Sequence, residues 1–251
     1  MPQAVILGTG AALPAPEQEN TYWLLLGDRT SFLVDCAGSP IQRLQRADQN
    51  PATLTGLILT HHHPDHIYGV PILLLGMWLL RRSLPLDIYA PSKTLSIVRE
   101  TIRLLEWEQW PARFPLRTHE IPLIVGAQVL DNTDFTIMSV PVCHLVPTIG
   151  LRIRAKTTGR VLAYPSDTEP CEIVKRLASN ADLLLHESTG EEPGHSSAAQ
   201  AGEIAEQCHV RHLILVHYAA IDDHTARLTA AASAHFRGKI TLAREFDVFE
   251  F

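Results

Sequence analysis

The sequence has little cysteine, no long apolar run and no excess of positive charge. Its four cysteines are far apart and form no C-x-x-C pair, which predicts free thiols in a reducing cytoplasm rather than a disulfide framework. The longest apolar run, residues 70–80, is well short of the ~20 residues that span a bilayer, so we expect a buried or interfacial helix and no membrane segment. The N-terminus carries no basic leader, so no signal peptide is expected. A formal net charge of −6 argues against nucleic-acid binding through overall charge and leaves open a local basic patch.

Short apolar runs rich in β-branched residues recur along the chain and are typical of strands. They lie at residues 4–8, 22–26, 31–35, 56–60, 86–90, 135–140, 149–154, 161–165, 182–186, 212–217 and 239–243. A spacing of three to four between apolar residues predicts helices at 92–107, 170–178, 197–208 and 223–236. We find no linker or repeat and predict one α+β domain over residues 1–251, with sheets packed together and helices outside.

The stretch LTHHHPDHIYGVP, residues 59–71, holds four histidines and an aspartate within six positions. It follows a strand-like run, so the polar residues lie where a buried strand ends. Three imidazoles and one carboxylate make a ligand set for zinc or a similar metal, and they belong to His61, His63, Asp65 and His66. His62 alternates away from its two neighbours and is not expected to be a ligand. A solvated polar loop is the alternative interpretation, which the position after a hydrophobic strand disfavours.

Three further ligand-type residues end or follow strand-like runs: His144, Asp167 and His217. Each alone is more typical of a capping or core residue. Together with the histidine-rich loop they predict that polar side chains from four strand ends converge on one edge of the sheets.

This order of residues resembles the metallo-β-lactamase superfamily, and the resemblance covers essentially the whole chain. It implies an αββα four-layer sandwich with two divalent metal ions at its edge, with zinc expected and manganese or iron as alternatives. It also implies the ligand sets: one metal held by His61, His63 and His144, the other by Asp65, His66 and His217, with Asp167 bridging them.

Further segments resemble the ribonuclease Z branch: LGTGAALP (7–14), LVDCAGSPIQRL (33–44), THHHPDHIYGVPILL (60–74), PSDT (165–168), HEST (186–189) and GHSS (194–197). The resemblance implies attack of a metal hydroxide on a phosphodiester, at RNA 3′ ends or in smaller molecules. His195 would stabilise charge or act as general acid, Glu187 would orient it, and Asp65 would accept the proton of the nucleophile. Asp35 matches a family aspartate and is expected to be structural. Ser196 is predicted to cap the next helix, whose free N–H groups would face a phosphate oxygen.

The chain departs from that branch at the flexible basic arm, which the tRNA-maturing members carry between the counterparts of His144 and Asp167. Only 22 residues separate these two here, enough for a hairpin. Without the arm, processing of full-length tRNA is not expected. Because the metal ligands alone suit several hydrolyses, a hydrolase of carboxylic or sulfuric esters, lactones or lactams is kept as an alternative, and a non-hydrolytic binding or sensor protein as a further one. We also expect a homodimer. The segment 76–118, with three tryptophans, is interpreted as a helical cover, with a dimer interface or a pocket wall as alternatives.

Overall fold

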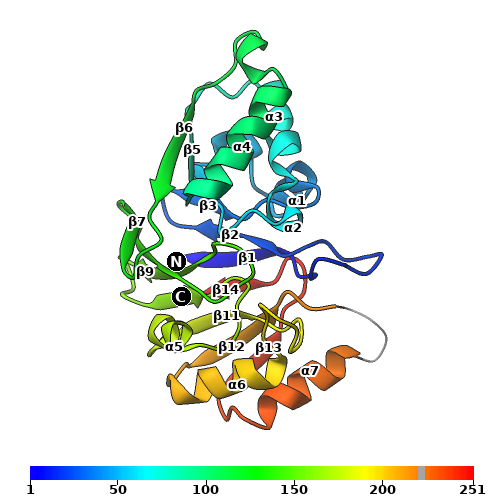
Figure 1. The fold of residues 1–251 in the computed structure, drawn as a ribbon. Helices are drawn as coiled ribbons and strands as arrows, with labels where there is room; N and C mark the ends of the chain where they lie inside the picture. Colours follow the sequence, from blue (N-terminus) through cyan, green and yellow to red (C-terminus); the bar gives the residue numbers. More distant parts are fainter. Residues whose placement is uncertain (220–223) are drawn as a thin grey trace.

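The structure, a computed structural model, describes residues 1–219 and 224–251 and is built around two mixed β-sheets of seven strands each. The sheets lie face to face and helices cover their outer faces, so the layers follow the order α/β/β/α (Figure 1). This confirms the αββα sandwich predicted from the sequence. Among the described residues no helix is long and apolar enough to cross a membrane.

The first sheet has the strand order β14-β1-β2-β3-β4-β5-β6. Its first three ladders are antiparallel and its last three, from β3 to β6, are parallel. The strands are β1 (Gln3–Gly8), β2 (Tyr22–Leu26), β3 (Ser31–Val34), β4 (Gly56–Ile58), β5 (Leu86–Pro91), β6 (Leu116–Ile121) and β14 (Val248–Glu250). The α-helices of this half are α1 (Pro40–Arg46), α2 (Pro64–Ile67), α3 (Val70–Leu79) and α4 (Ser92–Leu104).

The second sheet has the order β13-β12-β11-β10-β9-β8-β7. Read from β7, it repeats three antiparallel ladders followed by three parallel ones. The strands are β7 (Ala127–Asp131), β8 (Phe135–Pro141), β9 (Ile149–Ala155), β10 (Val161–Tyr164), β11 (Leu183–Glu187), β12 (His212–Val216) and β13 (Lys239–Leu242). The helices are α5 (Glu172–Ala178), α6 (Ala198–Gln207) and α7 (His224–Ser233); the expected start of the last one, residue 223, lies outside the described residues.

Three apolar clusters hold the layers together, one between the sheets and one under the helices of each half. Strand β2 shows why these strands are apolar throughout: Trp23 and Leu25 point into the central cluster, while Tyr22 and Leu24 point into the cluster beneath the helices. A strand buried on both faces has no polar side to alternate with. The uninterrupted apolar runs of the sequence are therefore explained by the four layers.

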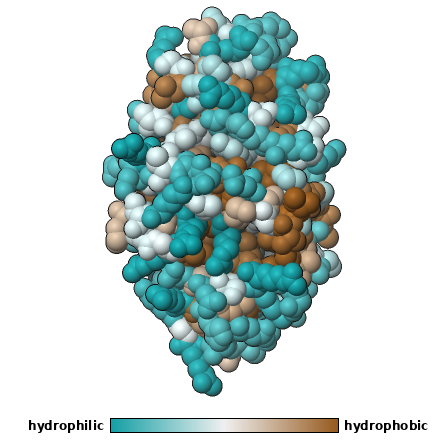
Figure 2. Space-filling model, turned by 90° about the vertical axis from the view of Figure 1, so that its left-hand side faces the viewer, coloured by the Kyte–Doolittle hydropathy of each residue, from teal (hydrophilic) through white to brown (hydrophobic). Residues whose placement is uncertain are grey.

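The elements that the sequence patterns did not predict are short or polar: β6, β7, β14, α1 and α2. Strand β6, LRTHEI, forms the free edge of the first sheet and exposes Arg117, His119 and Glu120. Charged side chains on an edge strand discourage pairing with another chain. Figure 2 shows this side of the molecule, where hydrophilic residues dominate and hydrophobic ones gather near mid-height. The β6–β7 connection itself exposes the apolar residues 123–125.

Candidate metal centre

The predicted ligands lie in loops that leave four strands at the same edge of the sandwich. The histidine-rich loop follows β4, and His144, Asp167 and His217 follow β8, β10 and β12. Pro64 begins the one-turn helix α2, which turns Asp65 and His66 back toward the strand ends. The structure thus brings together all seven residues that the sequence suggested as ligands.

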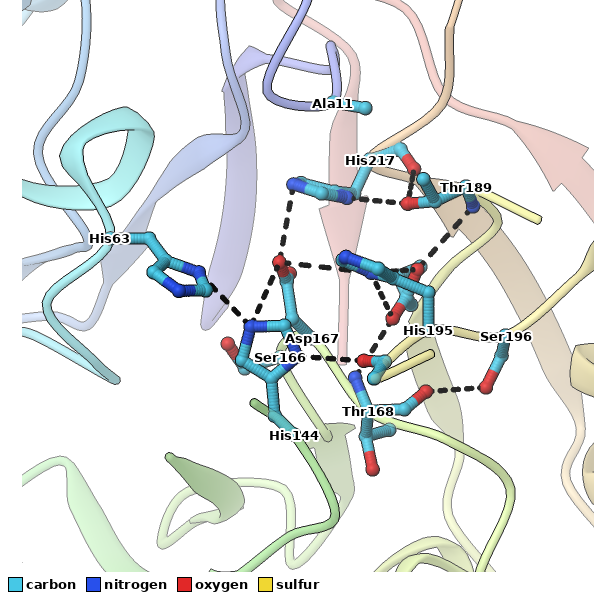
Figure 3. A network of polar contacts seen from close by, with 12 residues as sticks. Ala11, His63, His144, Ser166, Asp167, Thr168, Thr189, His195, Ser196 and His217 are labelled. Carbon is cyan, nitrogen blue, oxygen red and sulfur yellow. Dashed lines mark hydrogen bonds and ion pairs between the residues drawn. The ribbon is translucent and has the colours of Figure 1, made fainter. Parts of the chain in front are cut away.

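The carboxylate of Asp167 lies at the centre of this arrangement. Its Oδ2 is 3.5 Å from Nε2 of both His66 and His217, and 4.0 Å from Nε2 of both His61 and His144. Figure 3 shows the rings of His144 and His217 turned toward it. Ligands about 2.0–2.1 Å from a shared tetrahedral metal are themselves about 3.4 Å apart. Hence the N···O distances around Asp167 are closer to the distance between two ligands of the same metal ion than to the length of a hydrogen bond.

Two groups of potential metal-binding atoms emerge, and they contain the two predicted ligand sets, with Asp167, which was predicted to bridge them, grouped with the first set. Within each group the atoms lie less than 4.8 Å apart, and the groups are His61, His63, His144 and Asp167, and Asp65, His66 and His217. In the second group, Oδ2 of Asp65 is 3.5 Å from Nε2 of both histidines. A third combination, Asp167, His195 and His217, shows that His195 also borders the centre.

Four buried polar atoms of this centre have no hydrogen-bond partner among the residues that the structure describes: Nε2 of His61, His66 and His217, and Oδ1 of Asp167. Buried polar atoms are almost always paired, because an unpaired one loses its hydration without compensation. Neutral imidazole nitrogens and a carboxylate oxygen are donors suited to zinc. Therefore the residues present fit divalent metal ions, which would satisfy these four atoms.

The ligand imidazoles of the first half are held by hydroxyl and carboxylate groups on their far side. Nδ1 of His66 is 2.9 Å from Oδ2 of Asp35, and Nδ1 of His61 is 3.0 Å from the hydroxyl of Thr60. That hydroxyl and the Thr60 N–H also donate to Asp35. Such contacts fix which ring nitrogen is free for a metal. Asp35, expected to be structural, is thus in direct contact with a candidate ligand.

In the second half the corresponding contacts come from other loops. Nδ1 of His217 is 2.8 Å from the hydroxyl of Thr189, which in turn donates to the His217 carbonyl. Nδ1 of His144 donates to the carbonyl of Gly194 at 2.6 Å. His63 differs, because its Nδ1 faces the centre, 3.1 Å from Nε2 of His144. Single threonines and glycines carry no recognisable pattern, so sequence reasoning missed Thr60, Thr189 and the carbonyl of Gly194.

The charges of the centre shift the ionisation of its members strongly. Burial raises the pKa of Asp167, but the neighbouring His217 and His66 outweigh it and hold the pKa well below its usual value. Burial lowers the pKa of His66, yet Asp167 and Asp35 raise it well above normal. Metal binding at this centre would compete with protonation of these imidazoles, because only a deprotonated ring nitrogen can bind a metal.

A histidine–carboxylate pair borders the ligand cluster, as predicted. Nδ1 of His195 lies 3.0 and 3.1 Å from the two carboxylate oxygens of Glu187 and 3.9 Å from Oδ2 of Asp167. Glu187 is buried at the end of β11, and its Oε1 also accepts from the N–H of Thr168. Burial lowers the pKa of His195, but Glu187 overcomes this and raises it. A raised pKa favours the protonated ring that a general acid needs.

Two details of the sequence predictions can be checked at this site. Ser197, not Ser196, caps α6: its side chain accepts from the N–H of Gln200, whose own side chain accepts from the Ser197 N–H. The cap prediction was wrong because Ser196 is buried and donates to the carbonyl of Thr168 at 2.6 Å (Figure 3). His62, which was not expected to be a ligand, belongs to neither ligand group of the described residues.

The chain between His144 and Asp167 folds as expected. Strands β9 and β10 form an antiparallel hairpin within the second sheet, and residues 156–160 connect them. The three tryptophans of the segment 76–118 also match the helical-cover interpretation. The rings of Trp78 and Trp107 lie 5.2 and 5.1 Å from that of Trp110, against the cluster beneath the helices.

Comparison with known proteins places this architecture in context. Residues 30–218 match the family described as the β-lactamase superfamily domain. Ribonuclease Z of Methanothermobacter thermautotrophicus is 28% identical over an alignment that covers 94% of this chain and 92% of that protein. Ribonuclease Z of Mycobacterium bovis is also 28% identical, with 100% and 98% covered.

Solved structures with the same fold have differing names. The metallo-β-lactamase fold protein YhfI of Bacillus subtilis superposes with a TM-score of 0.82 at 22% identity, covering 99% of this chain and 98% of its own. The short form of human tRNase Z has the same TM-score and coverage at 25% identity. A diphosphatase of the PhnP family reaches 0.79 at 17% identity, covering 100% and 98%. The fold alone therefore leaves the substrate open.

Proposed function

The chain belongs to the β-lactamase superfamily domain family, and from this premise we propose that it is a metal-dependent phosphodiesterase related to ribonuclease Z. In this proposal two divalent ions, zinc in the first place, are held by the two ligand groups, and Asp167 is shared between them. The substrate is an RNA 3′ end or a smaller phosphodiester. Residues 1–251 act as one domain, because the central apolar cluster draws residues from both sheets.

The pair formed by His195 and Glu187 is the observation that carries this proposal. The metal ligands would serve ester, lactone or lactam hydrolysis equally well, since each needs a nucleophile and charge stabilisation. In addition, the imidazole of His195, held beside the ligand cluster by the buried carboxylate of Glu187, can donate a proton or carry a positive charge. A phosphodiester, with an anionic phosphoryl group and a poor leaving oxygen, benefits from both.

Bound metal ions would supply a nucleophile from water at neutral pH and Lewis-acid stabilisation of the phosphoryl oxygen. The protein residues do the rest. Asp65, 12% exposed at the mouth of the centre, accepts the proton released by the nucleophile. His195 donates a proton to the leaving oxygen or stabilises the negative charge that develops. Glu187 keeps the ring in place through two contacts to Nδ1, which leaves Nε2 free to face the substrate.

The test compares substrates and one matched pair of variants. Purified protein is assayed with bis-p-nitrophenyl phosphate, p-nitrophenyl acetate, a lactone, cyclic nucleotides and a pre-tRNA, each with and without chelator. We expect chelator-sensitive turnover of the diester, which falls by about 10²–10⁴-fold in His195→Ala, the usual range for a lost general acid. His62→Ala is the control, because it removes a histidine from the same loop outside both ligand groups.

The same assay can overturn the proposal. Ester or lactone turnover that does not depend on His195 or Glu187 would instead assign the alternative hydrolase. Cleavage of the pre-tRNA would show that the β9–β10 hairpin suffices where tRNA-maturing members of the ribonuclease Z branch carry an arm. Loss of diester activity in His62→Ala to the same extent would remove the special role given to His195.

We further propose a cytoplasmic homodimer. The four cysteines are free, as expected in a reducing compartment. Helix α3 exposes Ile72, Leu75 and Leu79 along one face, beside a groove of about 410 Å³ that Ile41 of α1 also lines. Apolar side chains at such spacing favour a second copy of the same face. Light scattering tests this: Leu79→Lys should yield a monomer, and an unchanged mass would place the contact elsewhere.

A further inference from the structure

Gly194 connects the metal centre to the proposed general acid. Its carbonyl accepts from Nδ1 of His144 at 2.6 Å, and the next residue in the chain is His195. Gly194 has φ +84°, and a Cβ there would lie 2.9 Å from both His144 Nδ1 and the Leu145 side chain. No side chain fits at this position without displacing the ligand ring. The position of the Gly194 backbone therefore determines both the orientation of the His144 ring and the place of His195, the next residue in the chain.

The N–H of Gly194 is held by a side chain from another loop. It donates to Oε1 of Glu169 at 2.8 Å. Gly194 is buried, and a buried N–H needs a partner to compensate for lost hydration. Glu169 is well placed to provide it, because its own N–H donates to the carbonyl of Cys143 at 2.7 Å and it follows Asp167 by two residues.

Glu169 consequently links three loops of the second half, those of His144, Asp167 and His195. Its backbone is tied to the loop of His144, it belongs to the loop of Asp167, and its carboxylate holds the loop of His195. The same side chain lines a cavity of about 340 Å³ together with His195 and Glu192. Because Glu169 is exposed and belongs to no ligand group of the described residues, the fold does not require a carboxylate there.

We propose that Glu169 is a positioning residue, which acts through Gly194 to orient His144 for its metal and to place His195 beside the substrate. The first effect is independent of the reaction, and the second rests on the function proposed above. The hydrogen bond to Gly194 requires an acceptor at the reach of a glutamate side chain. Neither the charge nor the carboxylate as such is needed.

Three substitutions separate reach from charge. Glu169→Gln keeps an acceptor at the same reach and removes the charge. Glu169→Asp keeps the charge and shortens the side chain, and Glu169→Ala removes both. Glu192→Ala is the matched control, since it deletes a carboxylate from the wall of the same cavity. Zinc affinity is measured by competition with a chromogenic chelator, and kcat and KM with bis-p-nitrophenyl phosphate.

We expect Glu169→Ala and Glu169→Asp to bind zinc about tenfold more weakly, the lower end of the range for lost support of a metal ligand. Their kcat should fall by about tenfold while KM stays within about twofold, because positioning acts on the reaction more than on binding. Glu169→Gln and Glu192→Ala should match the unmodified protein. Glu169→Ala with unchanged zinc affinity and kcat overturns the inference, and so does a loss in Glu169→Gln equal to that in Glu169→Ala. If the unmodified protein cleaves no diester, the proposed function fails, while the zinc measurement still decides the role of Glu169.

Discussion

The two halves of the molecule share one plan of strands and use it differently at the metal centre. Each sheet has three antiparallel ladders followed by three parallel ones, so β3 and β4 correspond to β10 and β11. Asp35, the aspartate after β3, contacts the far side of the His66 ring, whereas Asp167 after β10 lies within 4.0 Å of four candidate ligand histidines. The loops after these corresponding strands thus hold an outer supporting carboxylate in one half and the central one in the other.

The two halves also differ in how they supply ligands. The first half contributes four candidate ligands from six consecutive residues after β4, whereas the second contributes three from separate loops after β8, β10 and β12. In the first half the supporting groups, Asp35 and Thr60, are bonded to each other. In the second half they come from the loops of Thr189 and Gly194. The candidate ligands of the first half therefore share one loop and one pair of supporting side chains, whereas those of the second half depend on several separate loops.

Replacement of Asp167, the central aspartate, should have the largest effect on activity and on metal binding. Asp167→Asn removes the charge of a carboxylate whose Oδ2 lies within 4.0 Å of histidines from both ligand groups, whereas Asp65→Asn removes a charge from the second group only. We expect Asp167→Asn to lower kcat/KM by about a thousandfold or more, because metal-based charge stabilisation is worth several kcal/mol. Elemental analysis should find both metals depleted in Asp167→Asn and one retained in Asp65→Asn. Equal depletion in both variants would argue against the shared role of Asp167.

Replacement of the equivalent aspartate of the first half should cost less. Asp35→Asn keeps the size of the side chain but removes the carboxylate that faces Nδ1 of His66. That carboxylate favours the neutral tautomer with its proton on Nδ1, in which Nε2 is free to bind a metal. Metal affinity should fall by about 10–100-fold, as for other outer partners of ligand histidines. Asp134→Asn is the control, since Asp134 is also buried and accepts from the N–H groups of residues 29 and 30, in a turn away from the centre. If both variants lose metal equally, general destabilisation and not ligand orientation explains the loss.

The contrast between the halves also explains what could be predicted from the sequence. Ligands that crowd into one motif, such as His61 and Asp65, are visible because their spacing is unusual. The scattered ones, such as His144, were found because they end strand-like runs, and the family resemblance then implied which metal each would bind. Supporting contacts made by backbone carbonyls or single hydroxyls, at Gly194 and Thr189, leave no trace in composition or periodicity. The apolar strands were predicted well because they are buried on both faces, whereas the polar edge strand β6 was missed.

The smallest effect is on stability and concerns the two ends of β12, where the pKa values of two histidines are shifted in opposite directions. His217, after the strand, has its pKa lowered by burial and raised more strongly by Asp167, with a net increase. His212, at the start, lies against the ring of Phe249 with Nε2 2.9 Å from the hydroxyl of Thr241. Burial and then Lys239 lower the pKa of His212 from 6.5 to about 4. Within the described part of the chain, no carboxylate acts on His212 to favour its charged form.

His212 should therefore make the fold sensitive to acid. Below pH 6.5 the unfolded chain takes up a proton at this residue while the folded chain does so only near pH 4, so stability falls as the pH drops through this window. Between pH 7.5 and pH 5 the free energy of unfolding of His212→Gln should fall by about 1 kcal/mol less than that of the unmodified protein. This figure allows for solvent screening, since His212 is only partly shielded from water. Urea unfolding at both pH values, with chelator present so that metal binding does not contribute, measures the difference. An identical pH dependence in the two proteins would mean that the pKa of His212 is the same in the folded and unfolded states. Of these two histidines, only His217 at the metal centre would then have a shifted pKa.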